Sequence, residues 1–380
     1  MTIHWCGTGL SAIPGLRRLI EAGHDVTVWN RSLDKAVAAV GDLTNRIRAF
    51  DFDTLSAEMQ EGDIAVSMLP GDWHVPMAEM CINKGAHFVS SSYIAPEMRH
   101  LHAKALLRHV AVVNEIGLDP GIDHLMAHHL VDDYRHSTAF NPENDLSFLS
   151  YCGGIPKHPN PFRYKFSWSP LGVLKALRSP SRSIRDFAEF NVSRPWDAIS
   201  SYTAPLPTPE TFEVYPNRDS IPFMDDYHFD ASWRVKQFVR GTLRLNGWAE
   251  AWSDVFTEVE TLDGPAGDAR LKEMSDQFWR DNSYDEGEPD RVVLCVDLKA
   301  ERGEDTVWHK TFVMDAWGDD KSTAMARLVS VPVALAVMSV MKGEIPAGVS
   351  AAPSDPKLVE RYLAEVNQLA QHLNVVDHLH

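Results

Sequence analysis

The first 114 residues alternate short apolar segments with amphipathic helical segments, and this alternation limits the possible folds more than any other feature. Parallel strands need a crossover connection, usually a helix, so repeated strand and helix units predict a doubly wound parallel sheet. A glycine-rich turn follows the first expected strand, and the helix after that turn ends near Ala22. The expected strands are 3–6, 25–29, 47–52, 64–68, 87–90 and 110–113.

The chain after residue 118 has longer and more mixed strand candidates, at 146–152, 163–167, 235–245, 292–299 and 306–314. The last two flank a polar connection that contains Gly303, which is typical of a hairpin. We therefore predict an α/β chain in three parts. They are a Rossmann-type dinucleotide-binding domain (1–118), a substrate-binding and catalytic α+β domain on a mixed, mostly antiparallel sheet (119–320), and C-terminal helices (321–380, with helices at 321–341 and 356–373) that pack back on the nucleotide domain.

The composition disfavours several classes of partner. The chain has 53 acidic and 36 basic residues, a formal net charge of −17 and no Lys/Arg run, so we expect no nucleic acid. The longest apolar stretch, 328–341, is shorter than the roughly 20 residues of a spanning helix and contains Pro332. We predict a buried helix there and no membrane anchor, and the segment could also contribute to a homodimer. Four scattered cysteines form no zinc or disulfide pattern, and no secretion signal is visible, which together indicate a cytoplasmic location.

The glycine-rich turn has the spacing of a dinucleotide-binding fingerprint. Gly7, Gly9 and Ala12 lie between the first strand and its helix, and Leu10 and Ser11 complete the turn. Gly7 permits the tight turn, Gly9 lets backbone N–H groups approach a pyrophosphate, and the small Ala12 allows the helix to pack closely on the strand. The alternative is a glycine turn that binds no ligand.

The end of the second strand indicates which nicotinamide cofactor binds. NAD enzymes usually have Asp or Glu at this place, whereas this chain has Asn30, Arg31 and Ser32. Arg31 can pair with a 2′-phosphate and Ser32 can donate a hydrogen bond to it, so we predict NADP in preference to NAD. Arg31 could instead stack on the adenine or point to solvent, which leaves NAD possible.

The fourth strand ends at Ser67, and Leu69 and Pro70 follow it. Ligands bind outside the carboxyl ends of parallel strands, so we expect these residues beside the ribose or the nicotinamide. His74 begins the next helix and could be either functional or an ordinary helix-start histidine.

Six further motifs occur outside the fingerprint. They are Ser91-Ser92-Tyr93, Leu118-Asp119-Pro120-Gly121-Ile122-Asp123-His124, Ser150-Tyr151-Cys152-Gly153-Gly154, Tyr164-Lys165-Phe166-Ser167-Trp168-Ser169, Tyr215-Pro216-Asn217-Arg218-Asp219-Ser220 and Arg240-Gly241-Thr242-Leu243-Arg244. Together with the fingerprint they closely resemble the saccharopine reductases, which are the glutamate-forming saccharopine dehydrogenases. The resemblance covers most of the chain.

The resemblance implies an NADP-dependent oxidoreductase of lysine metabolism that acts on the secondary amine of saccharopine, an amino-acid substrate. The reaction reversibly gives L-glutamate and α-aminoadipate semialdehyde, and the residues do not determine its physiological direction. The family would place Tyr93, Asp119 and Cys152 beside the reacting C–N bond, and Arg218 and Thr242 at the substrate carboxylates. Lys165, Phe166 and Ser167 are weaker candidates for substrate contact.

Simpler readings exist for three of these residues. Asp119 could be an ordinary turn residue before Pro120, Cys152 a small buried hydrophobic residue, and Arg218 the partner of Asp219 in a structural ion pair.

Two departures from the family pattern border the expected pocket: the segment 155–161 is shorter than usual, and Arg163 replaces a glycine. The competing functions are reduction of another imine, such as that of a carboxynorspermidine-like carboxylated amine, and a non-catalytic NADP-binding sensor.

Overall fold

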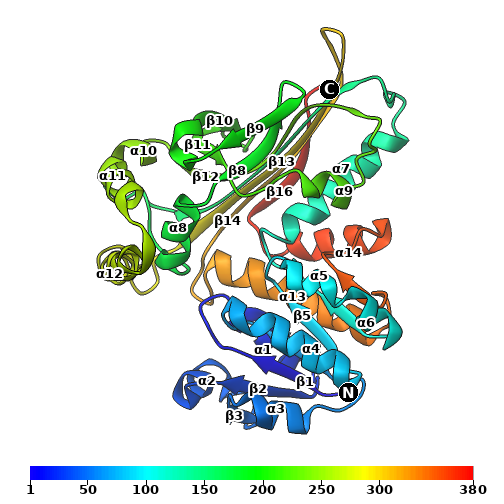
Figure 1. Cartoon of the computed structure of the whole chain (residues 1–380), viewed down its shortest axis with the longest axis vertical. Coiled ribbons are helices and arrows are strands. Elements are labelled where there is room, and N and C mark those ends of the chain that lie inside the picture. The colour runs from blue at the N-terminus through cyan, green and yellow to red at the C-terminus, as the bar shows by residue number, and fades with distance from the viewer. Residues whose placement is uncertain (380) are drawn as a thin grey trace. The chain divides into compact units, whose positions relative to one another are not determined.

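The computed structural model describes residues 1–379, and the chain divides into two compact units. Unit 1 comprises Met1–Leu125 and Ala326–Val366, and unit 2 comprises Met126–Met325 and the residues from Asn367 onward. Figure 1 shows the elements of both units in chain order from blue to red. The expected third part of the chain is therefore divided, because residues 326–366 belong to unit 1 while the residues after them join unit 2.

Unit 1 is built on a seven-stranded sheet with the order β15-β6-β5-β4-β1-β2-β3, in which every neighbouring pair is parallel. The predicted doubly wound parallel sheet is confirmed. The strand order reverses between β1 and β4, which is where ligands bind in such sheets. Its strands are β1 (Ile3–Cys6), β2 (Val26–Asn30), β3 (Ile47–Ala49), β4 (Ile64–Ser67), β5 (His87–Ser90), β6 (Ala111–Val113) and β15 (Gly348–Ser350).

Helices connect these strands and pack against the sheet (Figure 1). The third strand is shorter than expected because Asp51 caps the next helix, accepting a hydrogen bond from the backbone N–H of Thr54 at 2.8 Å. The helices are α1 (Ile13–Glu21), α2 (Leu33–Val40), α3 (Phe52–Glu58), η1 (Gly71–Trp73), α4 (His74–Lys84), α5 (Pro96–His100), α6 (His102–Leu107), α14 (Pro356–Asn367), and the greater part of α13 (Ala324–Met341).

Helix α13 is the apolar segment that the sequence predicts to be buried. Its 18 residues have a mean hydropathy of 1.9, which is long and apolar enough to cross a membrane, but 78% of this window is buried inside the structure. Residues such as Leu328, Val333 and Ala334 are completely buried. These values are those of a helix in a protein core.

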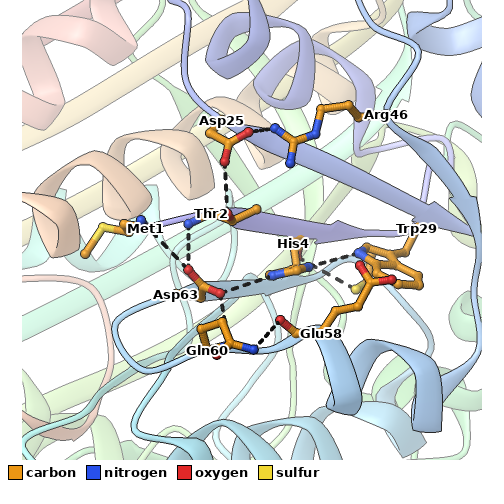
Figure 2. A network of polar contacts seen from close by, with 10 residues as sticks. Met1, Thr2, His4, Asp25, Trp29, Arg46, Glu58, Gln60 and Asp63 are labelled. Carbon is orange, nitrogen blue, oxygen red and sulfur yellow. Dashed lines mark hydrogen bonds and ion pairs between the residues drawn. The ribbon is translucent and has the colours of Figure 1, made fainter.

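A buried polar network holds the beginning of β1 against the beginning of β4 (Figure 2). Asp63 precedes β4 and accepts hydrogen bonds from the backbone N–H groups of Thr2 at 2.6 Å and Gln60 at 3.0 Å. The indole N–H of Trp29 donates to His4 Nδ1 at 3.1 Å. An indole N–H can only donate, so His4 is neutral and carries its proton on Nε2, which lies 3.5 Å from Asp63. Burial accordingly lowers the pKa of His4.

Helix α1 touches the backbone of α13. The N–H of Gly15 donates to Ser330 Oγ at 2.8 Å, and the hydroxyl of Ser330 donates to Ala326 O at 2.7 Å. A Cβ atom added at Gly15 would lie only 2.0 Å from Ser330 O. A glycine is therefore required at residue 15, although it lies outside the fingerprint.

Unit 2 contains a nine-stranded sheet with the path β10-β11-β12-β7-β13-β14-β16, while β8 pairs with β12 and β9. The β12–β7 pair is parallel and the other neighbours are antiparallel, so the predicted mixed, mostly antiparallel sheet is confirmed. The predicted hairpin is the β13–β14 pair. The strands are β7 (Asp145–Pro156), β8 (Ser181–Arg185), β9 (Ala188–Val192), β10 (Ser200–Ala204), β11 (Glu210–Pro216), β12 (Arg234–Leu245), β13 (Asp290–Arg302), β14 (Asp305–Trp317) and β16 (His372–Asp377).

Several helices of unit 2 gather near one end of this sheet (Figure 1). Side chains of these helices form an aromatic cluster, in which Trp248 and Trp252 are completely buried. The helices of unit 2 are the greater part of α7 (Ile122–His136), α8 (Pro170–Leu177), η2 (Pro195–Ala198), α9 (Pro222–Asp226), α10 (Trp248–Ala251), α11 (Ser253–Thr261) and α12 (Gly264–Asn282).

Two expectations for this unit are wrong. Residues 163–167 form no strand: Phe166 makes a single bridge to Ser283, and its side chain packs in the aromatic cluster instead of on a sheet. The last expected helix ends at Asn367, and β16 follows it and pairs with β14. Neighbouring Val375 and Val376 favour a strand because β-branched side chains fit a pleated surface.

We predict that Gly15→Ala destabilises the protein by about 2 kcal/mol or more, because the added methyl group must displace the backbone of α13. Helix propensity alone would predict that Gly15→Ala raises the free energy of unfolding by about 1 kcal/mol. Thermal and urea unfolding measure the effect. Gly9→Ala is the matched control, since a Cβ atom there meets nothing within 4 Å. Equal stability of the two variants would show that α1 and α13 do not require this contact.

Candidate functional site

A pocket of about 520 Å³ opens in unit 1 where β1 and β2 end. Of the residues predicted to bind the cofactor, Gly9, Leu10, Asn30, Arg31 and Ser32 line it. The other lining residues are Thr8, Ile13, Lys35, Ala38 and Ala39. The predicted turns after the first and second strands therefore meet at one cavity.

The turn after β1 presents unsatisfied donors to this pocket. Gly7 has a φ of 105° and its Cβ would lie 2.7 Å from Met68 O, so a glycine is needed to make the turn. The backbone N–H groups of Gly9, Leu10 and Ser11 donate to no acceptor within residues 1–379. Thr8 Oγ1 is buried and also lacks a hydrogen-bond partner. Such a cradle of donors fits a pyrophosphate.

Asn30 connects the two turns. Its Oδ1 accepts from the N–H of Thr8 at 3.2 Å, and its Nδ2 donates to Ser32 O at 2.8 Å. An acidic residue at this position could accept the first hydrogen bond but could not donate the second. Asn30 thus positions both turns without adding a negative charge to the pocket.

Two cations face the pocket without a protein partner. Neither Arg31 nor Lys35 makes a salt bridge or hydrogen bond in the described part of the chain, and both are exposed. Lys35 was not predicted from the sequence. Its position in the first turn of α2, directly after the Asn-Arg-Ser turn, could have identified it, because the start of this helix adjoins the end of β2. The arrangement suits an anionic group beside Ser32.

The ends of β4 and β5 are joined through His74. Its Nδ1 lies 2.9 Å from Ser67 Oγ and its Nε2 lies 2.8 Å from Ser92 Oγ. Burial lowers the pKa of His74 to about 4, so the ring is neutral at pH 7, with one nitrogen that donates and one that accepts. The segment after Ser67 also adjoins the glycine turn, since Met68 O is the atom nearest to a Cβ built at Gly7.

The predicted catalytic residues Tyr93 and Asp119 lie together. The Tyr93 hydroxyl donates to Asp119 Oδ1 at 3.1 Å, and both residues are partly accessible. The hydroxyl oxygen can therefore accept a proton from another group while its own proton is directed to the carboxylate. This pair has the geometry of a short proton relay.

A buried acidic and imidazole cluster supports this loop and was not predicted. Glu115 Oε1 accepts from the N–H of Ile94 at 2.8 Å, and its Oε2 lies 3.0 Å from His124 Nε2. Asp123 Oδ1 accepts from the N–H of Gly121 at 2.7 Å. Glu115, Asp123 and His124 are almost completely buried. They hold the segment around Asp119 in place, so Asp123 is a structural carboxylate in this arrangement.

In unit 2, Cys152 and Thr242 occupy paired positions on the adjacent strands β7 and β12. Arg244 lies two residues after Thr242 and so projects from the same face of the sheet. Its side chain is buried, with only 6% exposure, and no carboxylate pairs with it in residues 1–379. The guanidinium carbon lies 4.8 Å from the Tyr164 ring centre and 5.4 Å from that of Trp248.

A buried guanidinium without a counter-ion is costly unless an anion binds to it. Arg244 Nε has no acceptor, although one of its other nitrogens donates to Leu243 O at 3.4 Å. The sequence motif contained Arg244, but nothing in its spacing showed that the side chain would be buried among aromatic rings. Arg244 is therefore a candidate anion ligand that the structure adds to Thr242.

The remaining predicted substrate residues have different surroundings. Arg218 is exposed, with a φ of 58°, while its neighbour Asp219 accepts two hydrogen bonds from Arg182 at 3.1 and 2.8 Å. Lys165 is paired with Glu288 at 2.5 Å, so its charge is already balanced.

Phe166 is only 1% exposed and belongs to the aromatic cluster. Ser167 lies beside Gly154, since its Oγ is 3.8 Å from a Cβ built there. Of these two residues, Ser167 therefore adjoins the Tyr-Cys-Gly-Gly motif, whereas Phe166 is a core residue.

Comparison with known proteins gives a consistent result for the two halves of the chain. The family model described as the saccharopine dehydrogenase NADP binding domain matches residues 5–113, and the one described as the saccharopine dehydrogenase C-terminal domain matches residues 117–370. The saccharopine dehydrogenases (NADP+, L-glutamate-forming) of Pyricularia oryzae and Saccharomyces cerevisiae are 28% and 29% identical to this chain, and each alignment covers 95% of both proteins.

A solved structure is similar over the same length. It is the apo, histidine-tagged saccharopine dehydrogenase (L-Glu forming) from Saccharomyces cerevisiae, with 25% identity, a TM-score of 0.80 and 99% coverage of both chains. The alignment with the Pyricularia oryzae protein spans 439 positions, more than the 380 residues here, so that relative contains segments that this chain lacks.

We predict that His74 makes stability depend on pH between 6.5 and about 4. In this window the unfolded chain binds more protons than the folded one, because the folded pKa is lowered, so stability falls as the pH falls. Between pH 7.5 and pH 5 the contribution of His74 is about 2 kcal/mol. Urea unfolding of the wild type and His74→Gln at both pH values measures it.

The wild type should lose more stability than His74→Gln over this range. His100→Gln, which removes an exposed histidine of unit 1, is the matched control and should keep the wild-type dependence. If His74→Gln follows the wild-type curve, then His74 is not held neutral by burial.

Proposed function

Because the chain belongs to the saccharopine dehydrogenase family, we propose that it is an NADP-dependent oxidoreductase that acts on the secondary amine of saccharopine. The products of the oxidation are L-glutamate and α-aminoadipate semialdehyde, and the reverse reaction condenses and reduces them. The observation that carries the proposal is the match of the two domain families, one after the other, to almost the whole chain. The unpaired cations and donors described above supply the physical support.

The pocket of unit 1 fits NADP. The N–H groups of Gly9, Leu10 and Ser11 suit the pyrophosphate, and Thr8 Oγ1 offers one more hydrogen-bonding group. Arg31 and Lys35 would pair with the 2′-phosphate, where Ser32 could donate a hydrogen bond. When bound, NADP+ accepts the hydride from the substrate carbon attached to the secondary amine.

Unit 2 would recognise the acidic ends of the substrate. Saccharopine carries three carboxylates, and a buried guanidinium such as Arg244 binds a carboxylate through two parallel hydrogen bonds. We propose Arg244 and Thr242 for one carboxylate and Arg218 for another. Lys165 contributes less, because Glu288 already neutralises it.

Tyr93 and Asp119 would accept the proton and stabilise the positive charge that develops on the substrate. Loss of hydride and of the amine proton leaves a C=N bond whose protonated form is cationic, and a nearby carboxylate stabilises such a cation. The Tyr93 oxygen can take the proton of the amine or of the attacking water while its own proton moves toward Asp119. Water then adds to the carbon, the C–N bond breaks, and the nitrogen leaves with glutamate. Cys152 would contact the reacting centre from β7.

The experiment that tests the function is oxidation of saccharopine with NADP+, followed by absorbance of the reduced cofactor and identification of the amino-acid product. We expect L-glutamate and NADPH in equal amounts. Asp119→Asn should lower kcat about a hundredfold, because it removes the proton acceptor and the negative charge. Glu97→Gln, an exposed site on α5, is the control. Turnover of a different carboxylated amine but not saccharopine would overturn the substrate assignment. Cofactor binding without any turnover would indicate a sensor.

Removal of the two free cations should change the preference between cofactors. We predict that Arg31→Ala combined with Lys35→Ala lowers kcat/KM for NADP+ by about a hundredfold and leaves that for NAD+ nearly unchanged, because two charge-assisted contacts to the 2′-phosphate are lost. Lys104→Ala serves as the control, since Lys104 is paired with Glu79. An equal loss with both cofactors would mean that these residues do not read the 2′-phosphate.

A further inference from the structure

A cluster of two histidines and one aspartate lies on the sheet of unit 2 and contains none of the residues assigned above. Asp297 belongs to β13, His309 to β14, and His378 directly follows β16. Their ligating atoms all lie within 4.8 Å of one another. His309 Nε2 is 2.7 Å from Asp297 Oδ2, and the His309 and His378 rings are stacked with centres 4.0 Å apart.

These distances suit a metal ion after small side-chain rotations. Zinc lies about 2.0–2.1 Å from histidine nitrogen and carboxylate oxygen, so neighbouring ligands of a tetrahedral ion are about 3.3 Å apart. His309 Nε2 lies against the Asp297 carboxylate, and His378 Nε2 lies against the Thr311 hydroxyl that is bonded to the same carboxylate. Two imidazoles and one carboxylate are ligands that prefer zinc-like transition metals to magnesium or calcium.

A threonine holds the carboxylate in place. Thr311 Oγ1 donates to Asp297 Oδ2 at 2.5 Å and lies 2.8 Å from His378 Nε2. Outer hydrogen bonds of this kind orient the ligands in protein metal sites. Because the hydroxyl has one proton and gives it to Asp297, the Nε2 of His378 donates to Thr311 when no ion is bound.

The cluster also borders a cavity of about 260 Å³, which Tyr202, Gln237 and Ser147 help to line. The one cation among the lining residues, Lys299, is paired with Glu301 at 2.8 Å, so its charge is balanced locally. Three protein ligands beside an open cavity leave a fourth coordination position for water or an external ligand.

We propose that Asp297, His309 and His378 bind one divalent transition-metal ion of the zinc class. Both histidines bind the ion as neutral imidazoles: each Nε2 lone pair coordinates the ion and the ring proton moves to Nδ1. Thr311 keeps its hydrogen bond to Asp297. It joins β16, the edge strand formed by the end of the described chain, to the β13–β14 hairpin. The ion is therefore expected to stabilise the folded protein, since it binds a site that exists only when these strands are paired.

The site is separate from the proposed catalytic residues of this unit. Asp297 pairs with Leu149 of β7, and the register between β13 and β7 is unbroken from Asp145 to Pro156. Leu149 and Cys152 are three residues apart, so their side chains project from opposite faces of the sheet. The ion would lie on the face opposite to Cys152 and would take no part in hydride transfer.

The test uses the full-length protein after treatment with a chelator and dialysis. Zn²⁺ is titrated calorimetrically, and Co²⁺ is used as a spectroscopic probe because its visible d–d bands report coordination by protein ligands. We expect one Zn²⁺ per chain, a rise in melting temperature on binding, and no competition by Mg²⁺. His378→Ala, which removes an exposed side chain, should weaken binding about tenfold or more and abolish the cobalt bands.

His309→Gln provides a second variant and should give the same loss, so the result does not depend on one substitution. His136→Ala removes an exposed histidine elsewhere in unit 2 and should leave Zn²⁺ affinity and the melting-temperature rise unchanged. Circular dichroism confirms that each variant is folded. Absence of stoichiometric Zn²⁺ binding by the folded wild type, or affinity that is unchanged in both His378→Ala and His309→Gln, would overturn the proposal.

Discussion

The backbone contact between α1 and α13 determines what the nucleotide pocket can offer to a ligand. Gly15 gives its N–H to Ser330, and Pro14 has none, so the first turn of α1 has little left to donate. The donors that remain are those of the turn before the helix, from Gly9 to Ser11. The sequence predicts that the backbone N–H groups of the glycine turn approach a pyrophosphate at the helix N-terminus. The packing of α1 leaves most of the available donors in the glycine turn.

The excess of acidic residues makes a cation without a carboxylate partner informative. The chain has 53 acidic and only 36 basic residues, so carboxylates are abundant, and typical cations such as Arg17 and Arg291 are paired with Asp42 and Asp315. Surface cations without a partner are common in proteins, but here Arg31 and Lys35 share one cavity. Arg244 differs from these two surface cations because it is buried. A buried charge without a counter-ion carries a large desolvation cost.

The fold of unit 1 could be predicted closely because each parallel strand is short, apolar and followed by an amphipathic helix. The same reasoning failed at residues 163–167, whose alternating aromatic residues look like a strand but pack among tryptophans that come from a distant part of the chain. Strands β8 to β11 were not predicted. The faces of β8, β9 and β10 are partly exposed and polar, and β8 and β11 join the sheet by pairing with β12.

The residues of the candidate site also fall into a group that the sequence indicated and a group that it did not. Residues with a local signal, such as Gly9 after a strand or Arg31 after the next, line one pocket at the ends of β1 and β2. Lys35, Arg244 and the Glu115–His124 pair were missed, because their roles depend on which side chains have no partner, or on contacts that the chain makes only when folded. The role of Asp119 and Tyr93 beside the reacting bond came from the family resemblance, and their hydrogen bond gives that assignment a physical basis.

The two faces of the sheet in unit 2 carry different chemistry, and the register of β7 keeps them apart. Tyr151 packs in an apolar cluster with Leu243 and Val293, while its neighbour Cys152 projects to the face that carries Thr242 and Arg244. A shift of the register between β7 and β12 by one residue would move each side chain of β7 to the opposite face of the sheet. Gly153 opposes such a slip, because a Cβ atom at that position would lie 2.3 Å from Leu243 O. The glycine that follows Cys152 in the motif therefore allows β7 and β12 to approach closely, and this approach sets which side chains can meet a substrate.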